Sequence, residues 1–164
     1  ETIPPTYHFH PMRLRDALAV RRWRYAGEYA IYDLGLFTLL IAVLVDVTVG
    51  KQAGISFFGV TTDADGLMGI ASYAHRGEDV EIGLGLRPDL TGRGLGPSFV
   101  RAIMDLGREL YHPRTFSLTV ATFNHRAITT YERAGFIASG ATRPTAFHGK
   151  RYTELLMSRP AEGE

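Results

Sequence analysis

The stretch "RPDLTGRGLGPSF", residues 87–99, decides how this chain is interpreted. It places three glycines around one arginine, between a strand-like run and a helix-like run: Gly92, Gly94, Gly96 and Arg93. Glycines let consecutive N–H groups turn toward one ligand, and the start of a helix attracts anions. An arginine adds a charged donor. A plain turn needs fewer glycines, so the stretch predicts a cradle for a pyrophosphate.

The spacing of these glycines excludes two common phosphate loops. No Gly-Lys-Ser/Thr follows, as the NTP-binding P-loop requires. The pattern G-x-G-x-G lacks the third glycine of the dinucleotide fingerprint at its proper offset, and no acidic residue ends the following strand to hold a ribose. The loop is therefore a phosphate loop of another kind.

The run before the loop, "VEIGLGLRP" at Val80–Pro88, alternates apolar residues with Glu81, Gly83 and Gly85. Strict alternation predicts a strand. Its second face carries almost no side chains at the two glycines. Either a ligand lies against the backbone there or another element packs closely, and the residues alone leave both alternatives open.

The gross composition sets limits on the function. The 164 residues, 45% hydrophobic and 21% charged, suit one globular domain spanning 1–164. A net charge of +1 gives no field for nucleic acid or an anionic membrane. The absence of cysteine excludes disulfides, thiolate metal sites and a cysteine nucleophile, and it fits a cytoplasmic location. The six histidines show no metal-ligand spacing.

The first half of the chain predicts a strand, two helices and a hairpin. Residues 7–12 alternate like a strand, and residues 13–23 predict a helix that places Leu14, Ala17 and Leu18 on one face. We expect Arg24–Asp33 to be loop-like and Leu34–Thr48 to form a second, buried helix. Two strands then meet at Asp65-Gly66, where Gly66 would accept a positive φ.

The second half predicts two helices and three strands. A helical stripe precedes a strand, a second helix begins at an Asn cap and ends at a glycine, and two strands close the chain. The residues that carry these patterns are Phe99, Ala102, Ile103, Leu106 and Leu110 in the stripe, Phe116, Leu118 and Val120 in the strand, Asn124 and Gly135 at the helix ends, and "FIASGA" and "RYTELLMS" in the closing strands. The order predicts an α/β fold of the α+β type, with a mixed, mostly antiparallel central sheet flanked by helices.

Two of these segments resemble one known family. "VEIGLGLRPDLTGRGLGPSFV" and "NHRAITTYERAGF" are similar to the GNAT superfamily of acyl-CoA-dependent N-acetyltransferases, and the predicted order of elements extends the resemblance over nearly the whole chain. The family's loop has Arg/Gln-x-x-Gly-x-Gly/Ala, and Thr91 stands here at its first position. The second motif, N-x-x-A-x-x-x-Y-E-x-x-G-F from Asn124 to Phe136, is the more specific of the two.

The resemblance implies acetyl-CoA as acyl donor and no metal. The CoA pyrophosphate would lie on the amides of Gly92 to Gly96, and the pantetheine arm would run beside Leu84–Leu86, where the sheet is splayed. The implied cofactor-binding residues are Leu84, Gly85, Leu86, Thr91, Gly92, Arg93, Gly94, Leu95, Gly96, Asn124 and Tyr131.

The implied reaction is direct attack of a primary amine on the thioester. Tyr131, on one helix face with Asn124 and Ile128, would protonate the departing CoA thiolate. Glu81 is the candidate base, with an ordered water as the alternative for that task and an ion pair with arginine as the alternative for the residue. A backbone N–H near Leu84–Leu86 would stabilise the oxyanion.

The acceptor is expected to be a small-molecule or peptide amine, with neither nucleic acid nor membrane as partner. The last two strands and the aromatic segment would bind it, with Trp23, Tyr25, Tyr29 and Tyr32 as walls and Glu28 or Asp33 attracting the cation. Two alternatives remain open. One is a non-catalytic acyl-CoA-binding or sensing module, and the other is a homodimeric interaction protein built around the apolar run Leu34–Val45.

Overall fold

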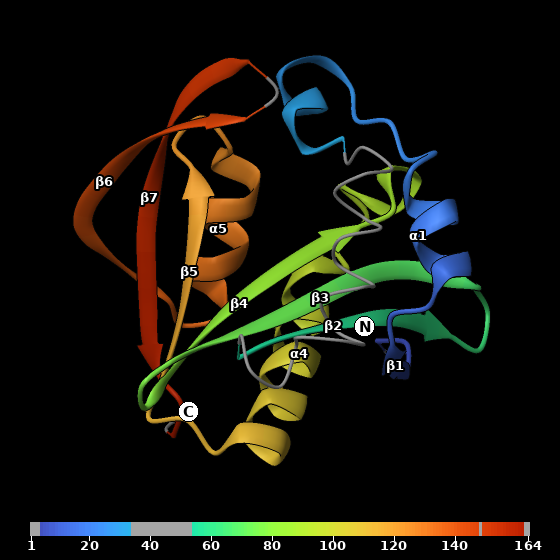
Figure 1. The fold of residues 1–164 in the computed structure, drawn as a ribbon, viewed down its shortest axis with the longest axis horizontal. Coiled ribbons are helices and arrows are strands. Elements are labelled where there is room, and N and C mark those ends of the chain that lie inside the picture. Colours follow the sequence, from blue (N-terminus) through green and yellow to red (C-terminus); the bar gives the residue numbers. More distant parts are fainter. Residues whose placement is uncertain (1–3, 34–53, 148, 163–164) are drawn as a thin grey trace. The chain divides into compact units, whose positions relative to one another are not determined.

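The computed structural model describes residues 4–33, 54–147 and 149–162. In chain order the elements are β1 (Tyr7–Pro11), α1 (Leu14–Val20), the 3₁₀-helix η1 (Gly27–Tyr32), β2 (Ile55–Thr62), β3 (Leu67–Arg76), β4 (Asp79–Leu86), the 3₁₀-helix η2 (Pro88–Leu90), α4 (Gly96–Tyr111), β5 (Thr115–Ala121), α5 (His125–Arg133), β6 (Ile137–Phe147) and β7 (Lys150–Pro160) (Figure 1). The helix expected at Leu34–Thr48, and with it the dimer contact expected at Leu34–Val45, lies outside the described residues.

The strands form one mixed sheet in the order β1-β2-β3-β4-β5-β7-β6. The pairs β1–β2, β2–β3, β5–β7 and β7–β6 are antiparallel, whereas β4 and β5 are parallel. That parallel pairing joins only Asp79–Glu81 to Thr115–Ser117, although both strands continue beyond it. The predicted fold class, a mostly antiparallel sheet flanked by helices, is confirmed.

The chain divides into two compact units. The first unit comprises Glu1–Ala74 and Leu84–Leu95, and the second comprises His75–Gly83 and Gly96–Glu164. The division passes through β4 and falls immediately before α4. The expectation of a single domain over 1–164 stays a prediction.

The predicted hairpin is present in the first unit, but its turn closes differently from the prediction. The backbone N–H of Thr62 donates to the carbonyl of Asp65 at 3.1 Å, and the N–H of Asp65 donates to the Thr62 hydroxyl at 3.1 Å. Gly66 does not adopt a positive φ. The side chain of Thr62 supplies the hydrogen bond that closes the turn.

Helix α1 presents a different face to the interior than its leucines predict. Leu14 and Leu18 are 51% and 42% exposed, whereas Asp16, Ala17 and Val20 are buried. The carboxylate of Asp16 accepts the N–H of Arg13 at 2.8 Å and lies 2.9 Å from Nε2 of His10. Because this partly buried pair holds Asp16 inward, the face that carries both leucines turns toward water.

The segment after α1 is more regular than expected. Arg24–Asp33 contains the 3₁₀-helix η1, so the loop prediction is wrong for Gly27–Tyr32. Asp33 ends this helix and accepts the backbone N–H of Tyr25 at 2.9 Å. That hydrogen bond joins the two ends of the segment.

The second unit is built around β5. Phe116, Leu118 and Val120 are buried as predicted, and α4 covers this face of the strand, since the Arg108 guanidinium lies 5.6 Å from the centre of the Phe116 ring. The buried side of α4 includes the predicted Phe99 and Ile103, together with Val100, Met104 and Gly107. The predicted stripe is wrong at its end, because Leu110 is exposed.

Both predicted ends of α5 are confirmed. The Asn124 side chain accepts the N–H of Ala127 at 3.1 Å, and Gly135 follows the helix with φ 86°. The guanidinium of Arg159 donates to the carbonyl of Ala134 at 2.6 Å. A side chain on β7 therefore caps the end of the helix, where a cation is favourable.

Strands β6 and β7 are longer than predicted. β6 lies at the edge of the sheet, and eight of its residues from Ile137 to Pro144 are exposed. Its register with β7 is interrupted between Ala138 and Thr142, at Gly140 with φ 78°. Such an interruption is a β-bulge-like irregularity of an edge strand.

Replacing Asp16 by alanine is expected to lower the free energy of unfolding by about 2 kcal/mol, because a helix cap is lost and a half-buried His10 loses its partner. Urea denaturation measures this. Asp63→Ala is the matched control, since His8 and Asp63 form a similar pair at 2.8 Å in which both side chains are exposed. Equal losses in the two variants would contradict a special role of Asp16.

Candidate functional site

The glycine loop has the backbone conformation that the sequence predicts. Gly92 and Gly94 adopt φ values of 76° and 79°, which other residues rarely accept. A Cβ at either position would meet no atom within 4 Å, and both glycines are exposed with Arg93 between them. Among the described residues, the amides of Gly92 and Gly94 donate to no acceptor. The loop therefore fits an anionic group approaching its backbone closely.

The third glycine of the stretch has a different role. Gly96 begins α4 in the second unit without a positive φ. A Cβ there would lie 2.8 Å from Cγ2 of Thr130 on α5, and 3.1 Å from its hydroxyl. Gly96 therefore lets the first turn of α4 pack directly against α5.

Thr91, which precedes these glycines, forms part of a local turn. Its hydroxyl donates to the carbonyl of Pro88 at 2.8 Å and closes the 3₁₀-helix η2. The similar family has Arg or Gln at this position. The side chain of Thr91 thus stabilises the entrance of the loop.

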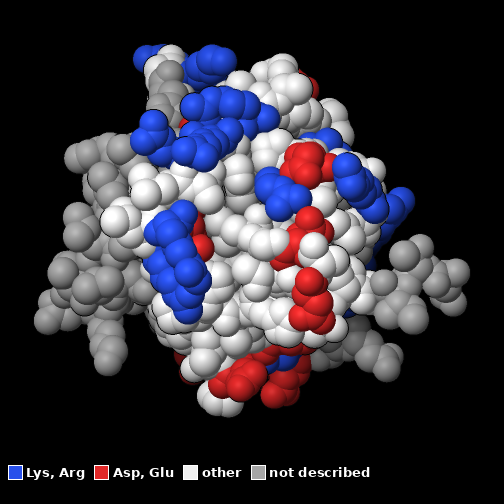
Figure 2. Space-filling view, turned by 90° about the vertical axis from the view of Figure 1, so that its right-hand side faces the viewer, with Lys and Arg blue, Asp and Glu red and all other residues white. Residues whose placement is uncertain are grey.

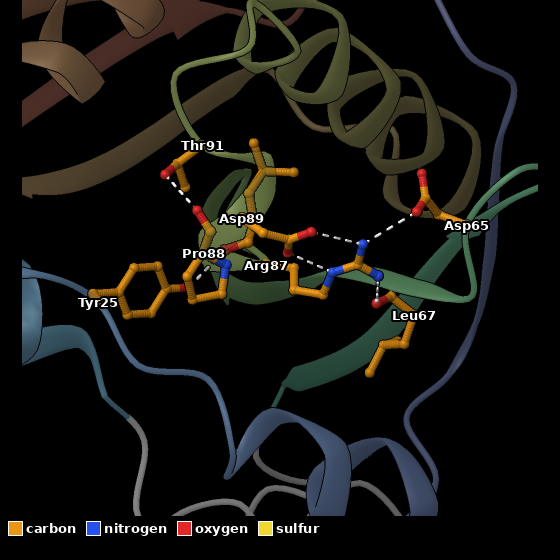
Figure 3. A network of polar contacts seen from close by, with 8 residues as sticks. Tyr25, Asp65, Leu67, Arg87, Pro88, Asp89 and Thr91 are labelled. Atoms are coloured by element: carbon orange, nitrogen blue, oxygen red, sulfur yellow. Dashed lines mark hydrogen bonds and ion pairs between the residues drawn. The ribbon is translucent and has the colours of Figure 1, made fainter.

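Arg87 holds the loop to the rest of the first unit (Figure 3). Its Nε and Nη2 atoms bind both carboxylate oxygens of Asp89, at 2.6 and 3.1 Å. Nη2 also donates to Asp65 at 3.1 Å, and Nη1 donates to the carbonyl of Leu67 at 3.2 Å. The network joins the β2–β3 hairpin to the start of the loop. Sequence reasoning missed it, and the only local signal is the short spacing of Arg87 and Asp89.

Arg87 and Asp89 each stabilise the charged form of the other. The hydrogen bond from Arg87 is the main cause that lowers the pKa of Asp89 below its usual value. The same hydrogen bond raises the pKa of Arg87, although burial opposes it. The ionised carboxylate is therefore stabilised in the folded state, and its contribution is lost as the pH falls through the lowered pKa.

The end of β4 makes contacts within the first unit. The hydroxyl of Tyr25 donates to the carbonyl of Leu86 at 2.7 Å. A Cβ at Gly85 would lie 3.4 Å from Cγ1 of Ile70 and 3.8 Å from the Tyr25 hydroxyl, which is ordinary contact. The chain's own side chains thus approach the bare strand face at Gly85.

The other residues expected to contact the acceptor differ in exposure. Trp23 is buried and packs with Ala17 and Val20. Glu28 is exposed and Tyr29 is half-buried. The structure brings Tyr25 and Tyr32 together edge-to-face, with ring centres 6.4 Å apart.

In the second unit, Asn124 caps the start of α5 and Tyr131 lies within that helix, and both residues are buried. The Tyr131 ring packs edge-to-face on Phe136 at 6.1 Å. Glu81, the candidate base, has its Oε2 atom 3.5 Å from Nε of Arg76 and its side chain 34% exposed. An ion pair was the alternative for Glu81, and the structure contains one.

The chain belongs to the acetyltransferase (GNAT) domain family, whose model matches residues 9–137. This confirms the family that the loop and the α5 motif indicated. No curated protein matches the sequence.

Solved structures of similar fold include two acetyltransferases. A spermidine N-acetyltransferase from Vibrio cholerae, solved in complex with CoA and spermine, has a TM-score of 0.76 at 16% identity, over 94% of this chain and 95% of that chain. A ribosomal-protein-S5-alanine acetyltransferase from Vibrio fischeri has a TM-score of 0.71 at 14% identity, over 95% and 93%. At these identities the similarity shows the fold alone.

Three further observations concern possible partners. Among the described residues, no group of three His, Asp or Glu side chains is placed to hold a metal ion. No helix in that part of the chain is long and apolar enough to cross a membrane. Figure 2 shows both basic and acidic side chains on one face of the molecule, so this face does not carry charge of a single sign.

Gly96→Ala is expected to lower the free energy of unfolding by about 1–3 kcal/mol, because the new methyl group overlaps Thr130. Thermal unfolding measures the loss. The same substitution in a Thr130→Ala background should cost less. Gly66→Ala is the control, since Gly66 has open space and no positive φ. A cost that persists without the Thr130 side chain would contradict this account of Gly96.

Replacing Arg87 by methionine is expected to return the pKa of Asp89 to its ordinary value of about 3.9. The carboxyl resonance of Asp89, followed by NMR, should titrate at lower pH in the native protein than in the variant. The variant should also lose less stability on acidification below about pH 4. Arg114→Met, which breaks the separate 2.8 Å pair with Glu78, should leave Asp89 unchanged. An unshifted native titration would refute the pairing.

Proposed function

We propose that this protein transfers the acetyl group of acetyl-CoA to a primary amine. The observation that carries the proposal is the loop at Gly92 and Gly94. Both glycines have positive φ and open space at the Cβ position, and their amides donate to no acceptor among the described residues. Helix α4 begins directly after the loop at Gly96. Amides with these properties, followed by a helix N-terminus, suit a diphosphate.

The proposed cofactor contacts follow from the residue types. The amides from Gly92 to Gly96 would bind the diphosphate, with Arg93 as an exposed charged donor and Thr91 and Leu95 flanking the glycines. The backbone of Leu84, Gly85 and Leu86 and the amide of Asn124 would hold the pantetheine arm. Acetyl-CoA supplies the acetyl group as a reactive thioester.

Tyr131 is the proposed proton donor. A phenol, with a reference pKa of about 10, can protonate a thiolate whose conjugate acid has a pKa of about 8.5 at modest cost. The position of the phenol depends on α5, which is capped by Asn124 at its start and by Arg159 at its end. Both caps favour one fixed position of the helix.

The acceptor must present a neutral amine, so Glu81 or an ordered water would take its proton. The carboxylate of Glu81 already has Arg76 as a partner, with 3.5 Å between Oε2 and Nε, which favours the water for this task. We keep Trp23, Tyr25, Glu28 and Tyr29 as the proposed acceptor segment, with Trp23 supporting it from the interior. The structural neighbours include a spermidine N-acetyltransferase and a ribosomal-protein-S5-alanine acetyltransferase, so small-molecule and peptide amines both accord with the proposal.

We further propose a cytoplasmic location. The absence of cysteine supports a reducing compartment. One structural neighbour, a spermidine N-acetyltransferase from Vibrio cholerae, is dodecameric, which supports self-association of this fold. A homodimer is therefore part of the proposal.

The decisive experiment combines calorimetry with acetyl-CoA and an assay of free thiol release over a panel of amines. The chain has no cysteine to raise the background. Binding with amine-dependent thiol release supports the enzyme. Binding without release for any amine supports the acyl-CoA-sensing alternative, and absence of binding refutes both.

Tyr131→Phe is expected to lower kcat about 100-fold while leaving the Kd for acetyl-CoA unchanged, because only proton donation is lost. Tyr111→Phe is a matched control, since Tyr111 packs on His75 at the end of α4. Unchanged turnover in Tyr131→Phe would remove the proposed role.

Gly94→Ala is expected to weaken acetyl-CoA binding about tenfold or more, because a side chain disfavours φ 79° by about 1–2 kcal/mol and intrudes on the cradle. Calorimetry measures the change. Gly66→Ala serves again as the control. An unchanged Kd for Gly94→Ala would contradict a backbone cradle at this position.

A further inference from the structure

One face of the sheet in the second unit gathers charged side chains. Glu81 pairs with Ser117, Ala121 pairs with Glu154, and Glu154 pairs with Arg143. Directly paired residues point to the same side of a sheet, and residues an even number apart along a strand share a face. Glu81, Glu154 and Arg143 therefore lie on one face.

The helices of the second unit lie on the opposite face. Phe116, beneath Arg108 of α4, pairs with Arg159, whose side chain caps α5. Phe116 neighbours Ser117 along β5, so it points away from Glu81 and Glu154. Among the described residues of this unit, no helix covers the charged face.

Glu154 is a carboxylate held in a fixed position. Its Oε2 accepts the hydroxyl of Thr145 at 3.0 Å, and its Oε1 lies 3.4 Å from the hydroxyl of Tyr152. The Tyr152 ring packs edge-to-face on Phe123, with centres 6.4 Å apart. The Glu154 side chain is only 14% exposed. Fixing a half-buried anion between two hydroxyls prepares it to bind a cation.

The carboxylate of Glu154 is already paired with a cation, the guanidinium of Arg143. Nη2 of Arg143 donates to Oε2 of Glu154 at 2.8 Å, yet the Arg143 side chain is 68% exposed. The hydrogen bond to Glu154 is the main cause that raises the pKa of Arg143, and the charge of Glu81 adds to it. Arg143 comes from the edge strand β6, and its side chain is largely in water. Another cation that takes the place of its guanidinium keeps the charge of Glu154 paired.

Glu154 is linked through strand pairing and one backbone hydrogen bond to residues of the proposed site. Glu154 is opposite Ala121, and the carbonyl of Ala121 accepts the N–H of Asn124 at 2.9 Å. Asn124 starts α5, which also carries Tyr131. The charged face thus adjoins the start of the helix to which we assign cofactor binding and proton donation.

We infer that Glu154 binds a second cationic group of the acceptor, in exchange for Arg143, so that the acceptor class is a diamine or longer polyamine. The identification of this ligand as the acceptor rests on the proposed function. The reacting amine is neutral when it attacks, whereas the second ammonium keeps its charge and pairs with Glu154. Mono-amines make no use of this carboxylate.

The test compares 1,4-diaminobutane with butylamine, which lacks the second ammonium. Glu154→Gln should raise KM for the diamine about 10-fold to 100-fold, because a hydrogen bond to a charged group is lost, and should leave KM for butylamine nearly unchanged. Arg143→Gln should lower KM for the diamine about twofold to fivefold, because the internal competitor is removed. A merely structural ion pair predicts the same direction of change in both variants.

Glu78→Gln is the control, since Glu78 forms an exposed pair with Arg114 at 2.8 Å. Thermal unfolding establishes whether each variant folds, and Arg143→Gln decides the question alone if Glu154→Gln is unstable. A diamine KM that rises in Arg143→Gln, or a Glu154→Gln penalty equal for both amines, would overturn the inference.

Calorimetry separates this inference from the proposed function. If the native protein releases no thiol with any amine, the proposed function fails. Binding of 1,4-diaminobutane can still be measured directly in that case. Weaker binding to Glu154→Gln and tighter binding to Arg143→Gln support the cation site, and equal binding to all three proteins refutes it.

Discussion

The guanidinium of Arg87 makes the interactions on which the glycine loop depends. One side chain binds both oxygens of Asp89, reaches Asp65 across the hairpin turn and donates to the carbonyl of Leu67. Planar bidentate geometry restricts orientation as well as distance, which a lysine at this position would not do. The loop that follows has glycines with wide conformational freedom, so its conformation must be limited from outside. Arg87 limits it at its entrance, and the Thr91 hydroxyl continues this at the end of η2.

The glycines of the loop region serve two different physical needs. Gly92 and Gly94 provide positive φ beside open space, and Gly96 provides a close approach between α4 and α5. The short glycine motif therefore contains residues with two different roles, positive φ in the loop and close packing between helices. A substitution at Gly96 therefore acts through helix packing, whereas a substitution at Gly94 acts through backbone strain and ligand access.

The elements with local signals were predictable from the sequence. The Asn124 cap, the turn at Gly135 and the alternation along β5 each depend on neighbours within a few residues. Features that depend on distant partners were not. Asp65 is 22 residues from Arg87, so no local pattern indicates that network. Two other errors have nearby causes. The His10–Asp16 pair, six residues apart, turns a carboxylate of α1 inward, and the Thr62 hydroxyl, three residues from Asp65, closes the turn without a positive φ at Gly66. The family motifs identified the loop and α5, but the hydroxyl-held carboxylate at Glu154 has no motif.

The irregular edge strand β6 has a consequence for the behaviour of the protein at high concentration. A long, flat outermost strand would be a template on which strands of other molecules could add. Here the bulge near Gly140 bends the strand, Pro144 has no N–H to offer, and the charged Arg143 stands beside it. These three features oppose edge-to-edge pairing of β6 with a strand of another molecule, so the exposed edge is protected against fibre-like aggregation.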